Sequence, residues 1–210
     1  RFQAGHAERV GVPIPSTRSP ASRKELEQVA EQISFPCILK PDYSQSGARS
    51  LSGRKLLIVN SRQELLEAWG ILEGEGVACV LQEIVPGPDT ALVSYLGYWD
   101  EEGRERAFIT KRKLRQFPAL YGNGSIQRTE DLPQVAEYSR RLLEALDYRG
   151  FAGVEFKEDP RDGSLRFVEI NPRSSAMNEL AVAAGVDFPW IAYRSLAGMG
   201  VEEKVPAFRA

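Results

Sequence analysis

The sequence predicts an α+β fold, and three features lead to this prediction. Short apolar runs such as 77–83 and 90–98 have the length and composition of strands. Residues 133–146 place apolar side chains at the spacing of an amphipathic helix. Residues 154–171 form two strand-like runs around a cluster of turn formers, which indicates a hairpin. Strands and helices therefore alternate irregularly along one chain.

Composition narrows the class of protein. The chain has 210 residues, 42% of them hydrophobic, and a net charge of −2. A balanced charge provides no overall field that would attract nucleic acid or a membrane surface. No run approaches the roughly 20 apolar residues that span a bilayer. The chain begins at Arg1 without Met, so we expect a piece of a longer protein.

Histidine and cysteine usage argues against several kinds of chemistry. The one histidine, His6, lies near the start, which disfavours histidine metal sites and Ser-His-Asp chemistry elsewhere in the chain. Cys37 and Cys79 both lie in apolar, strand-like runs and are expected to be buried thiols rather than a disulfide or a zinc site. A reducing, cytoplasmic location fits this pattern.

The hairpin at 154–171 brings acidic residues together. Its pairing is expected to set Glu155 opposite Glu169, with Asn171 pointing the same way as Glu169. Facing carboxylates repel, and a bound cation would reverse the sign. Two carboxylates and an amide oxygen suit Mg²⁺ beside phosphate oxygens, although an ordinary solvated polar face would show the same pattern. The opposite face is expected to pack on a core through Val154, Phe156, Val168 and Ile170.

Two further segments could meet an anion. Lys40 ends the apolar strand 35–41, where its charge needs either an anionic partner or a path to the surface. Residues 42–53 form a small, polar, glycine-bearing loop. Such loops can lay backbone N–H groups against phosphates, although this one does not match the strict P-loop pattern.

Residues 82–89 are expected to form a hinge between two lobes. Two prolines and a glycine force the chain out of the preceding strand, and Asp89 follows. Backbone groups of such a segment can read an adenine edge, and an acid beyond it can bind ribose hydroxyls; a plain loop with surface acids is the alternative. Farther along, the basic run 111–115 is compatible with a solvated sheet edge that discourages aggregation.

The order of these features resembles the ATP-grasp superfamily. The resemblance lies in FPCILKP, LQEIVPGPD, KRKLRQFP and GVEF…FVEINPR and extends from Val10 to Met199. Within the superfamily, the chain looks most like bacterial carboxylate–amine ligase-type proteins. The resemblance implies an ATP-grasp fold of two α+β lobes with ATP bound between their sheets. The first lobe would span 1–81 with a partial lead-in helix, 82–89 would be the hinge, and 90–210 the second lobe; an upstream domain would precede them.

The resemblance also implies roles for individual residues. Phosphate oxygens would be held by Lys40, by Lys111 or Lys113 and by a loop that includes Ser46 and Gly47. The adenine pocket would be lined by Gln82, Glu83 and Val85, and the ribose would be bound by Asp89. One or two Mg²⁺ ions, or Mn²⁺ in their place, would be held by Glu155, Glu169 and Asn171, while Arg173 would steady the transferring phosphoryl group.

The implied activity is an ATP- and Mg²⁺-dependent ligase that joins a small-molecule carboxylate to an amine, or to a thiol. It would work through an acyl phosphate and release ADP and phosphate, with Lys111, Lys113 and Arg173 as the catalytic residues. A small-molecule kinase and a non-catalytic ATP-binding module are the alternatives. No nucleic-acid or membrane partner is expected, and a homodimer is left open.

Overall fold

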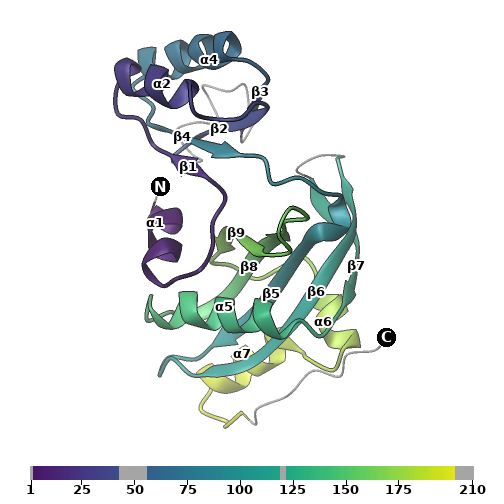
Figure 1. Ribbon diagram of the computed structural model, residues 1–210. Helices are drawn as coiled ribbons and strands as arrows, with labels where there is room; N and C mark the ends of the chain where they lie inside the picture. Colours follow the sequence, from purple (N-terminus) through teal and green to yellow (C-terminus); the bar gives the residue numbers. More distant parts are fainter. Residues whose placement is uncertain (1, 43–55, 119–121, 202–210) are drawn as a thin grey trace. The chain divides into compact units, whose positions relative to one another are not determined.

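The computed structural model describes residues 2–42, 56–118 and 122–201. The chain divides into two compact units, one made of Arg1–Gly5 and Ile14–Val85 and the other of His6–Pro13 and Pro86–Ala210 (Figure 1). Helix α1 (Phe2–Arg9) contributes residues to both. Each unit contains an antiparallel sheet with helices packed on it, as the α+β prediction requires. No helix in the described ranges has the length and apolar run required to cross a bilayer.

The first unit is built on a four-stranded sheet of order β1-β4-β2-β3. Its strands are β1 (Thr17–Arg18), β2 (Cys37–Pro41), β3 (Leu57–Val59) and β4 (Cys79–Glu83). Its helices are α2 (Arg23–Ala30) and α4 (Arg62–Gly74), which begin at the caps Ser22 and Ser61. Each cap hydroxyl accepts a backbone N–H three residues on, which pairs one of the unsatisfied donors at a helix start.

Strand alternation gives this sheet two different faces. Leu39 and Leu81 point to the face covered by α2 and α4, where they join a core with Leu65 and Leu72. Both cysteines are buried free thiols on the same side. Lys40 and Ile38 therefore point to the opposite face, away from these helices.

The second unit is built on a five-stranded sheet of order β7-β6-β5-β8-β9. Its strands are β5 (Leu92–Trp99), β6 (Glu105–Phe117), β7 (Asn123–Thr129), β8 (Gly150–Glu158) and β9 (Leu165–Asn171). A short 3-10 turn, η1 (Asp89–Ala91), leads into β5. The basic run 111–115 lies in β6, which pairs with strands on both sides, so the interpretation of this run as a sheet edge was wrong.

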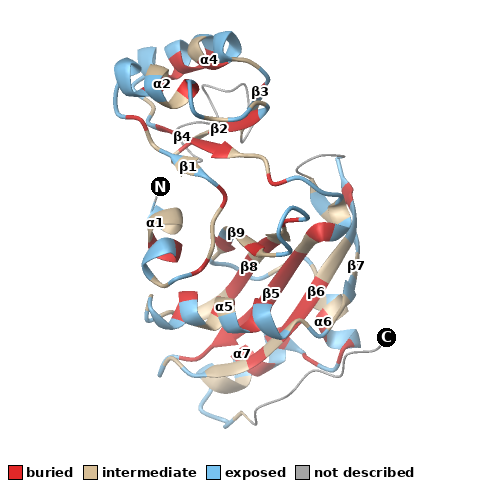
Figure 2. Ribbon diagram, in the orientation of Figure 1, coloured by how far each residue is buried: buried red, intermediate tan, exposed pale blue. Residues whose placement is uncertain are grey.

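Helices cover both faces of this sheet. Helix α5 (Pro133–Glu144) packs on one face, where Tyr138 contacts Phe156 and the Arg140 guanidinium lies over the Phe108 ring. Helices α6 (Asn178–Ala183) and α7 (Phe188–Leu196) pack on part of the other face, against Leu96 and Ile109. Figure 2 shows the resulting burial along the central strands. The part of that second face which lies beyond Leu96 carries polar residues instead.

The β8–β9 hairpin has the expected pairing at its acidic residues and a different one beyond them. Glu155 pairs with Glu169, as the sequence predicted, and Gly153 pairs with Asn171. The next pair is Phe156 with Phe167, because a β-bulge follows Glu155. Phe167 is therefore the buried partner of Phe156, and the assignment of Val168 to the same packed face was wrong; Val168 is the extra residue of the bulge and is only half-buried.

Candidate active site

The register of the second sheet aligns four polar residues in one row across four strands. Ser94 in β5 pairs with Lys111 on one side and with Glu155 on the other, and Glu155 pairs with Glu169. Directly paired residues of antiparallel strands point to the same face. With about 4.8 Å between strands, the row from Lys111 to Glu169 is roughly 14 Å long. Residues that are 58 positions apart in the sequence are thus placed on one face of one sheet.

The acidic end of the row carries electrostatic strain. Burial raises the pKa of the Glu155 carboxyl, and the negative charge of Glu169 raises it further. Lys113, Lys111 and Arg173 act in the opposite direction on that pKa without cancelling the rise. Asn171 lies one step along the same face, and its Nδ2 donates to Glu169 Oε1 at 2.8 Å. The three acidic and amide side chains therefore form one cluster of hard oxygen ligands.

The basic end of the row is buried. Lys111 is only 7% exposed, and its Nζ donates a hydrogen bond to Gln127 Oε1. Burial lowers the pKa of the Lys111 ammonium to about 8, despite the opposing effect of Glu155. Lys113 lies two residues along β6 on the same face and adds to the lowering of that pKa. Among the residues that the structure describes, no carboxylate lies at hydrogen-bond distance from this buried ammonium. The ammonium is therefore suited to meet an anionic ligand.

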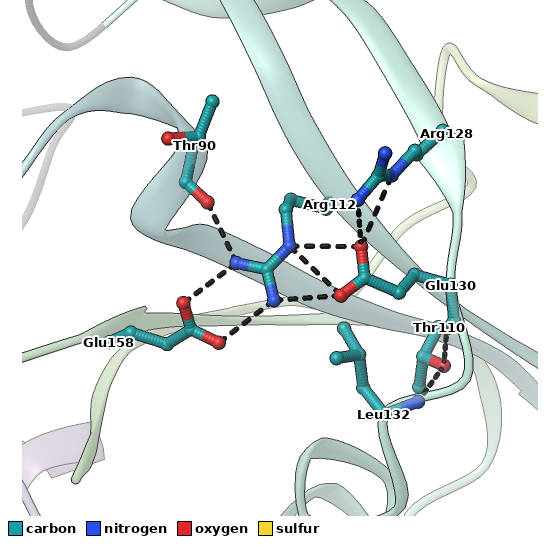
Figure 3. A network of polar contacts seen from close by, with 7 residues as sticks. All are labelled: Thr90, Thr110, Arg112, Arg128, Glu130, Leu132 and Glu158. Carbon is teal, nitrogen blue, oxygen red and sulfur yellow. Dashed lines mark hydrogen bonds and ion pairs between the residues drawn. The ribbon is translucent and has the colours of Figure 1, made fainter. Parts of the chain in front are cut away.

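Arg112 points to the reverse face of β6, where it joins three segments (Figure 3). Its guanidinium donates to both carboxylate oxygens of Glu130, at 2.9–3.0 Å, and to both of Glu158, at 2.7 and 2.9 Å. It also donates to the Thr90 carbonyl at 2.7 Å. These bidentate contacts fix β6 relative to the end of β8 and to η1. They consequently fix the direction in which Lys111 and Lys113 point.

Asp89 occupies η1 at the end of the second sheet. Gln116 Nε2 donates to Asp89 Oδ1 at 2.6 Å, and Gln116 is buried. Burial lowers the pKa of the nearby Lys157 ammonium, while the charges of Asp89 and Asp159 oppose that lowering. Asp89 is therefore in the same unit as the row of polar residues and is held against β6.

The first unit contains the other predicted site residues. Lys40 Nζ donates to Gln82 Oε1 at 3.1 Å, and Gln82 Nε2 donates to Thr17 Oγ1 at 3.1 Å. Glu83 pairs with the β1 segment, since its N–H donates to the Ser16 carbonyl at 2.9 Å and its Oε1 accepts the Ser16 N–H at 3.1 Å. The N–H of Glu83 is therefore already used in the pairing with this segment.

The structure therefore brings the predicted residues together in two groups. Lys40, Gln82, Glu83 and Val85 belong to the first unit. The second unit holds Asp89, Lys111, Lys113, Glu155, Glu169, Asn171 and the exposed Arg173. Ser46 and Gly47 lie outside the described residues. Sequence reasoning missed Ser94, Arg112 and Gln116, because their significance comes from strand pairing and not from any local pattern.

The acidic cluster is incomplete as a metal cage. Among residues 2–42, 56–118 and 122–201 there is no group of three or more His, Cys, Asp or Glu residues that could hold a metal ion. Two carboxylates and one amide, each binding through one oxygen, leave half of the positions of an octahedral cation to other oxygens. Such an arrangement fits a cation that arrives with an oxygen-rich ligand better than a permanently caged structural metal.

Comparison with protein families decides the class. Residues 79–210 match the family model described as ATP-grasp in the biosynthetic pathway with Ter operon. The match covers more than half of the chain and includes β4 to α7. The chain belongs to this ATP-grasp family. The resemblance seen in the sequence motifs is therefore confirmed.

Curated relatives are ligases and synthases. The ATP-grasp chain is 28% identical over 159 residues to the D-aspartate ligase of Enterococcus faecium (strain Aus0004), covering 73% of this chain and 38% of the relative. It is 24% identical over 204 residues to the carbamoyl phosphate synthase large chain of Methanosarcina acetivorans, covering 93% of this chain and 18% of the relative. The chain thus spans less than half the length of either curated relative.

Solved structures with low sequence identity share the fold. The ADP complex of the N5-carboxyaminoimidazole ribonucleotide synthetase purK matches with a TM-score of 0.69 at 17% identity, over 98% of this chain and 53% of that one. Biotin carboxylase from Campylobacter jejuni, in a β,γ-ATP complex, matches with a TM-score of 0.73 at 17% identity, over 94% and 45%. The expected ATP-grasp fold class is confirmed.

The repulsion between Glu155 and Glu169 yields a prediction about pH. Folding raises the pKa of Glu155 above its unfolded value of 4.5. The protonated carboxyl therefore contributes stability that is fully present below pH 4.5 and is lost as pH rises through the pKa of the folded state. Glu155→Gln should therefore raise the free energy of unfolding of the full-length protein at pH 7 in EDTA, by up to about 1 kcal/mol. The gain should vanish near pH 4. Urea denaturation at both pH values measures it.

The matched control is Glu137→Gln, on the exposed side of α5. It removes a carboxylate that has an arginine partner, so it should give no gain at pH 7. A Glu155→Gln variant that is less stable than the wild type at pH 7 would contradict the strained-pair account.

Proposed function

We propose that this protein is an ATP- and Mg²⁺-dependent ligase that joins a small-molecule carboxylate to an amine. The observation that carries the proposal is the row of Lys111, Glu155 and Glu169 on one sheet face, with Asn171 beside it. Family membership and the ligase relatives support an ATP-dependent ligation. The proposed lobes are residues 1–81 and 90–210, with 82–89 as the hinge.

Mg²⁺ fits the acidic cluster because its preferred ligands are oxygens and it commonly combines one or two carboxylates with phosphate oxygens. Glu155 and Glu169 would hold it, together with Asn171 after a half-turn of its amide presents the oxygen. When bound, the cation offsets negative charge on the phosphates. A structural neighbour solved with MgADP, the 2-oxoglutarate carboxylase biotin carboxylase domain of Hydrogenobacter thermophilus, supports this choice.

The other proposed roles follow from charge and placement. Asp89 would accept hydrogen bonds from the ribose, and Lys111 and Lys113 would bind phosphate oxygens. The first unit would supply Lys40 for the phosphates and Gln82, Glu83 and Val85 for adenine. Arg173 is exposed just beyond the cluster and would steady the phosphoryl group during transfer.

The proposed reaction needs no protein nucleophile. A carboxylate oxygen of the substrate attacks the γ-phosphorus of ATP, the bond to the β-phosphate oxygen breaks, and ADP leaves. The resulting acyl phosphate has a good leaving group. The amine attacks its carbonyl carbon, phosphate is expelled, and the amine loses a proton as the C–N bond forms. Lysine and arginine side chains stabilise charge that develops on the transferring group.

A screen for products tests the proposal in the full-length protein. ADP release, phosphate release and amide formation are measured with amino acids offered as both carboxylate and amine. The proposal predicts all three in equal amounts for at least one substrate pair. A stable phosphorylated product would instead indicate a kinase, and tight binding of Mg²⁺-ATP without turnover in any mixture would indicate a non-catalytic module.

Glu169→Gln separates binding from chemistry in the same assay. It should lower ADP release by about 100-fold or more, because it removes a ligand of the cation that offsets transition-state charge. Binding of ATP in EDTA should change little, since the adenine and ribose contacts lie elsewhere. Glu137→Gln is the matched control and should retain wild-type turnover. Near-normal turnover in Glu169→Gln would remove the metal role from this residue.

The lowered pKa of Lys111 predicts the alkaline limit of activity. A pKa of about 8 means that the ammonium charge is lost as pH rises through 8. The value of kcat/KM for ATP reports groups of the free enzyme and should fall above that pH. Lys111→Arg keeps its charge at every accessible pH, so its kcat/KM should no longer fall there. An unchanged alkaline limit in Lys111→Arg would contradict a phosphate-binding role for Lys111.

A further inference from the structure

The turn η1 is attached to β6 at two points. Gln116 Nε2 donates to the Asp89 carboxylate at 2.6 Å. Four residues earlier in β6, Arg112 donates to the carbonyl of Thr90 at 2.7 Å. Lys113 lies between the two attachment points, and Lys111 directly precedes Arg112. The strand that carries the proposed phosphate-binding lysines therefore also holds the residue proposed to bind ribose.

Gln116 lowers stability if its role is packing alone. It is 8% exposed, and within the described ranges its Oε1 is buried without a hydrogen-bond partner. An unpaired buried amide oxygen costs stability, which methionine or leucine would avoid at similar volume. The benefit of glutamine at this position must come from the other end of the amide, which contacts Asp89.

The hydrogen bond from Gln116 constrains the Asp89 side chain, whereas the contacts of η1 constrain only the backbone of Asp89. Pro88 and Thr90 hold the backbone of η1 through the 3-10 bond and the Arg112 contact. They leave the side-chain torsions of Asp89 free. The hydrogen bond from Gln116 engages Oδ1 and thereby selects one direction for the carboxylate.

We infer that Gln116 is a positioning residue that orients the Asp89 carboxylate toward the ribose hydroxyls, while Arg112 holds the turn that carries Asp89. The inference rests on the proposed function. It assigns Gln116 no contact with the reacting atoms. Its effect is to make the site distinguish a nucleotide with ribose hydroxyls from one without them, because an oriented carboxylate gains more from a hydroxyl donor than a mobile one.

Nucleotide discrimination tests this inference in the full-length protein. The dissociation constants of ATP and of 2′,3′-dideoxy-ATP are measured by calorimetry. The value for 2′,3′-dideoxy-ATP divided by the value for ATP is the discrimination ratio, and it isolates the hydroxyl contacts. Gln116→Met should lower the ratio by about tenfold, the scale of one hydrogen bond to a charged group. Asp89→Asn should lower it by a similar factor, and the double variant should fall no further, because the two residues act as a unit.

Two further variants separate positioning from stability. Gln63→Met is the matched control, since Gln63 Nε2 also donates to a carboxylate, Glu67 Oε1, at 2.9 Å on the exposed side of α4. It should leave the ratio unchanged. Gln116→Glu keeps the shape of the side chain and repels Asp89, so it should lower the ratio even if Gln116→Met folds poorly.

The outcomes distinguish this inference from the proposed function. If Asp89→Asn loses the discrimination and both Gln116 variants keep the wild-type ratio, the positioning role is wrong and the ribose role of Asp89 stands. If the wild type does not discriminate, or Asp89→Asn keeps the wild-type ratio, the ribose role of Asp89 is wrong and the role of Gln116 falls with it.

Discussion

Two carboxylates that face each other across paired strands repel, and the second unit retains such a pair in Glu155 and Glu169. Burial and mutual repulsion raise the pKa of Glu155, so the pair opposes folding at neutral pH. A position selected for stability alone would not keep both acids. The bulge after Glu155 lets this pairing coexist with a packed core, since it returns Phe156 and Phe167 to the buried face.

The two faces of this sheet differ: one carries the row of polar residues, and the other carries the contacts of Arg112. On one face, α6 and α7 pack against the residues around Leu96. Lys111, Ser94 and Glu155 lie on the same face but outside that hydrophobic core. On the other, Arg112 joins β6 to the end of β8 and to η1 through Glu158 and Thr90. Arg112, on one face of β6, thus fixes the direction of Lys111 and Lys113 on the opposite face.

Sequence reasoning recovered the features that local patterns encode. The turn formers at 159–163 predicted the hairpin, and folding the hairpin about this turn predicted the pairing of Glu155 with Glu169. It did not recover β7, because a run rich in glycine and asparagine reads as a turn. The bulge at Val168 and the contact of Gln116 with Asp89 were also missed, since both depend on segments that are distant in the sequence.

The central claim is that the Glu155–Glu169 pair persists because a divalent cation bound with a nucleotide lies between the two acids. Counting bound cations tests it most directly. The full-length protein is saturated with a non-hydrolysable ATP analogue, Mn²⁺ replaces Mg²⁺, and electron paramagnetic resonance measures the immobilised ion. The account predicts immobilised Mn²⁺ in the wild type and none beyond the free nucleotide complex in the Glu155→Gln, Glu169→Gln double variant. Equal immobilisation in both proteins would contradict it.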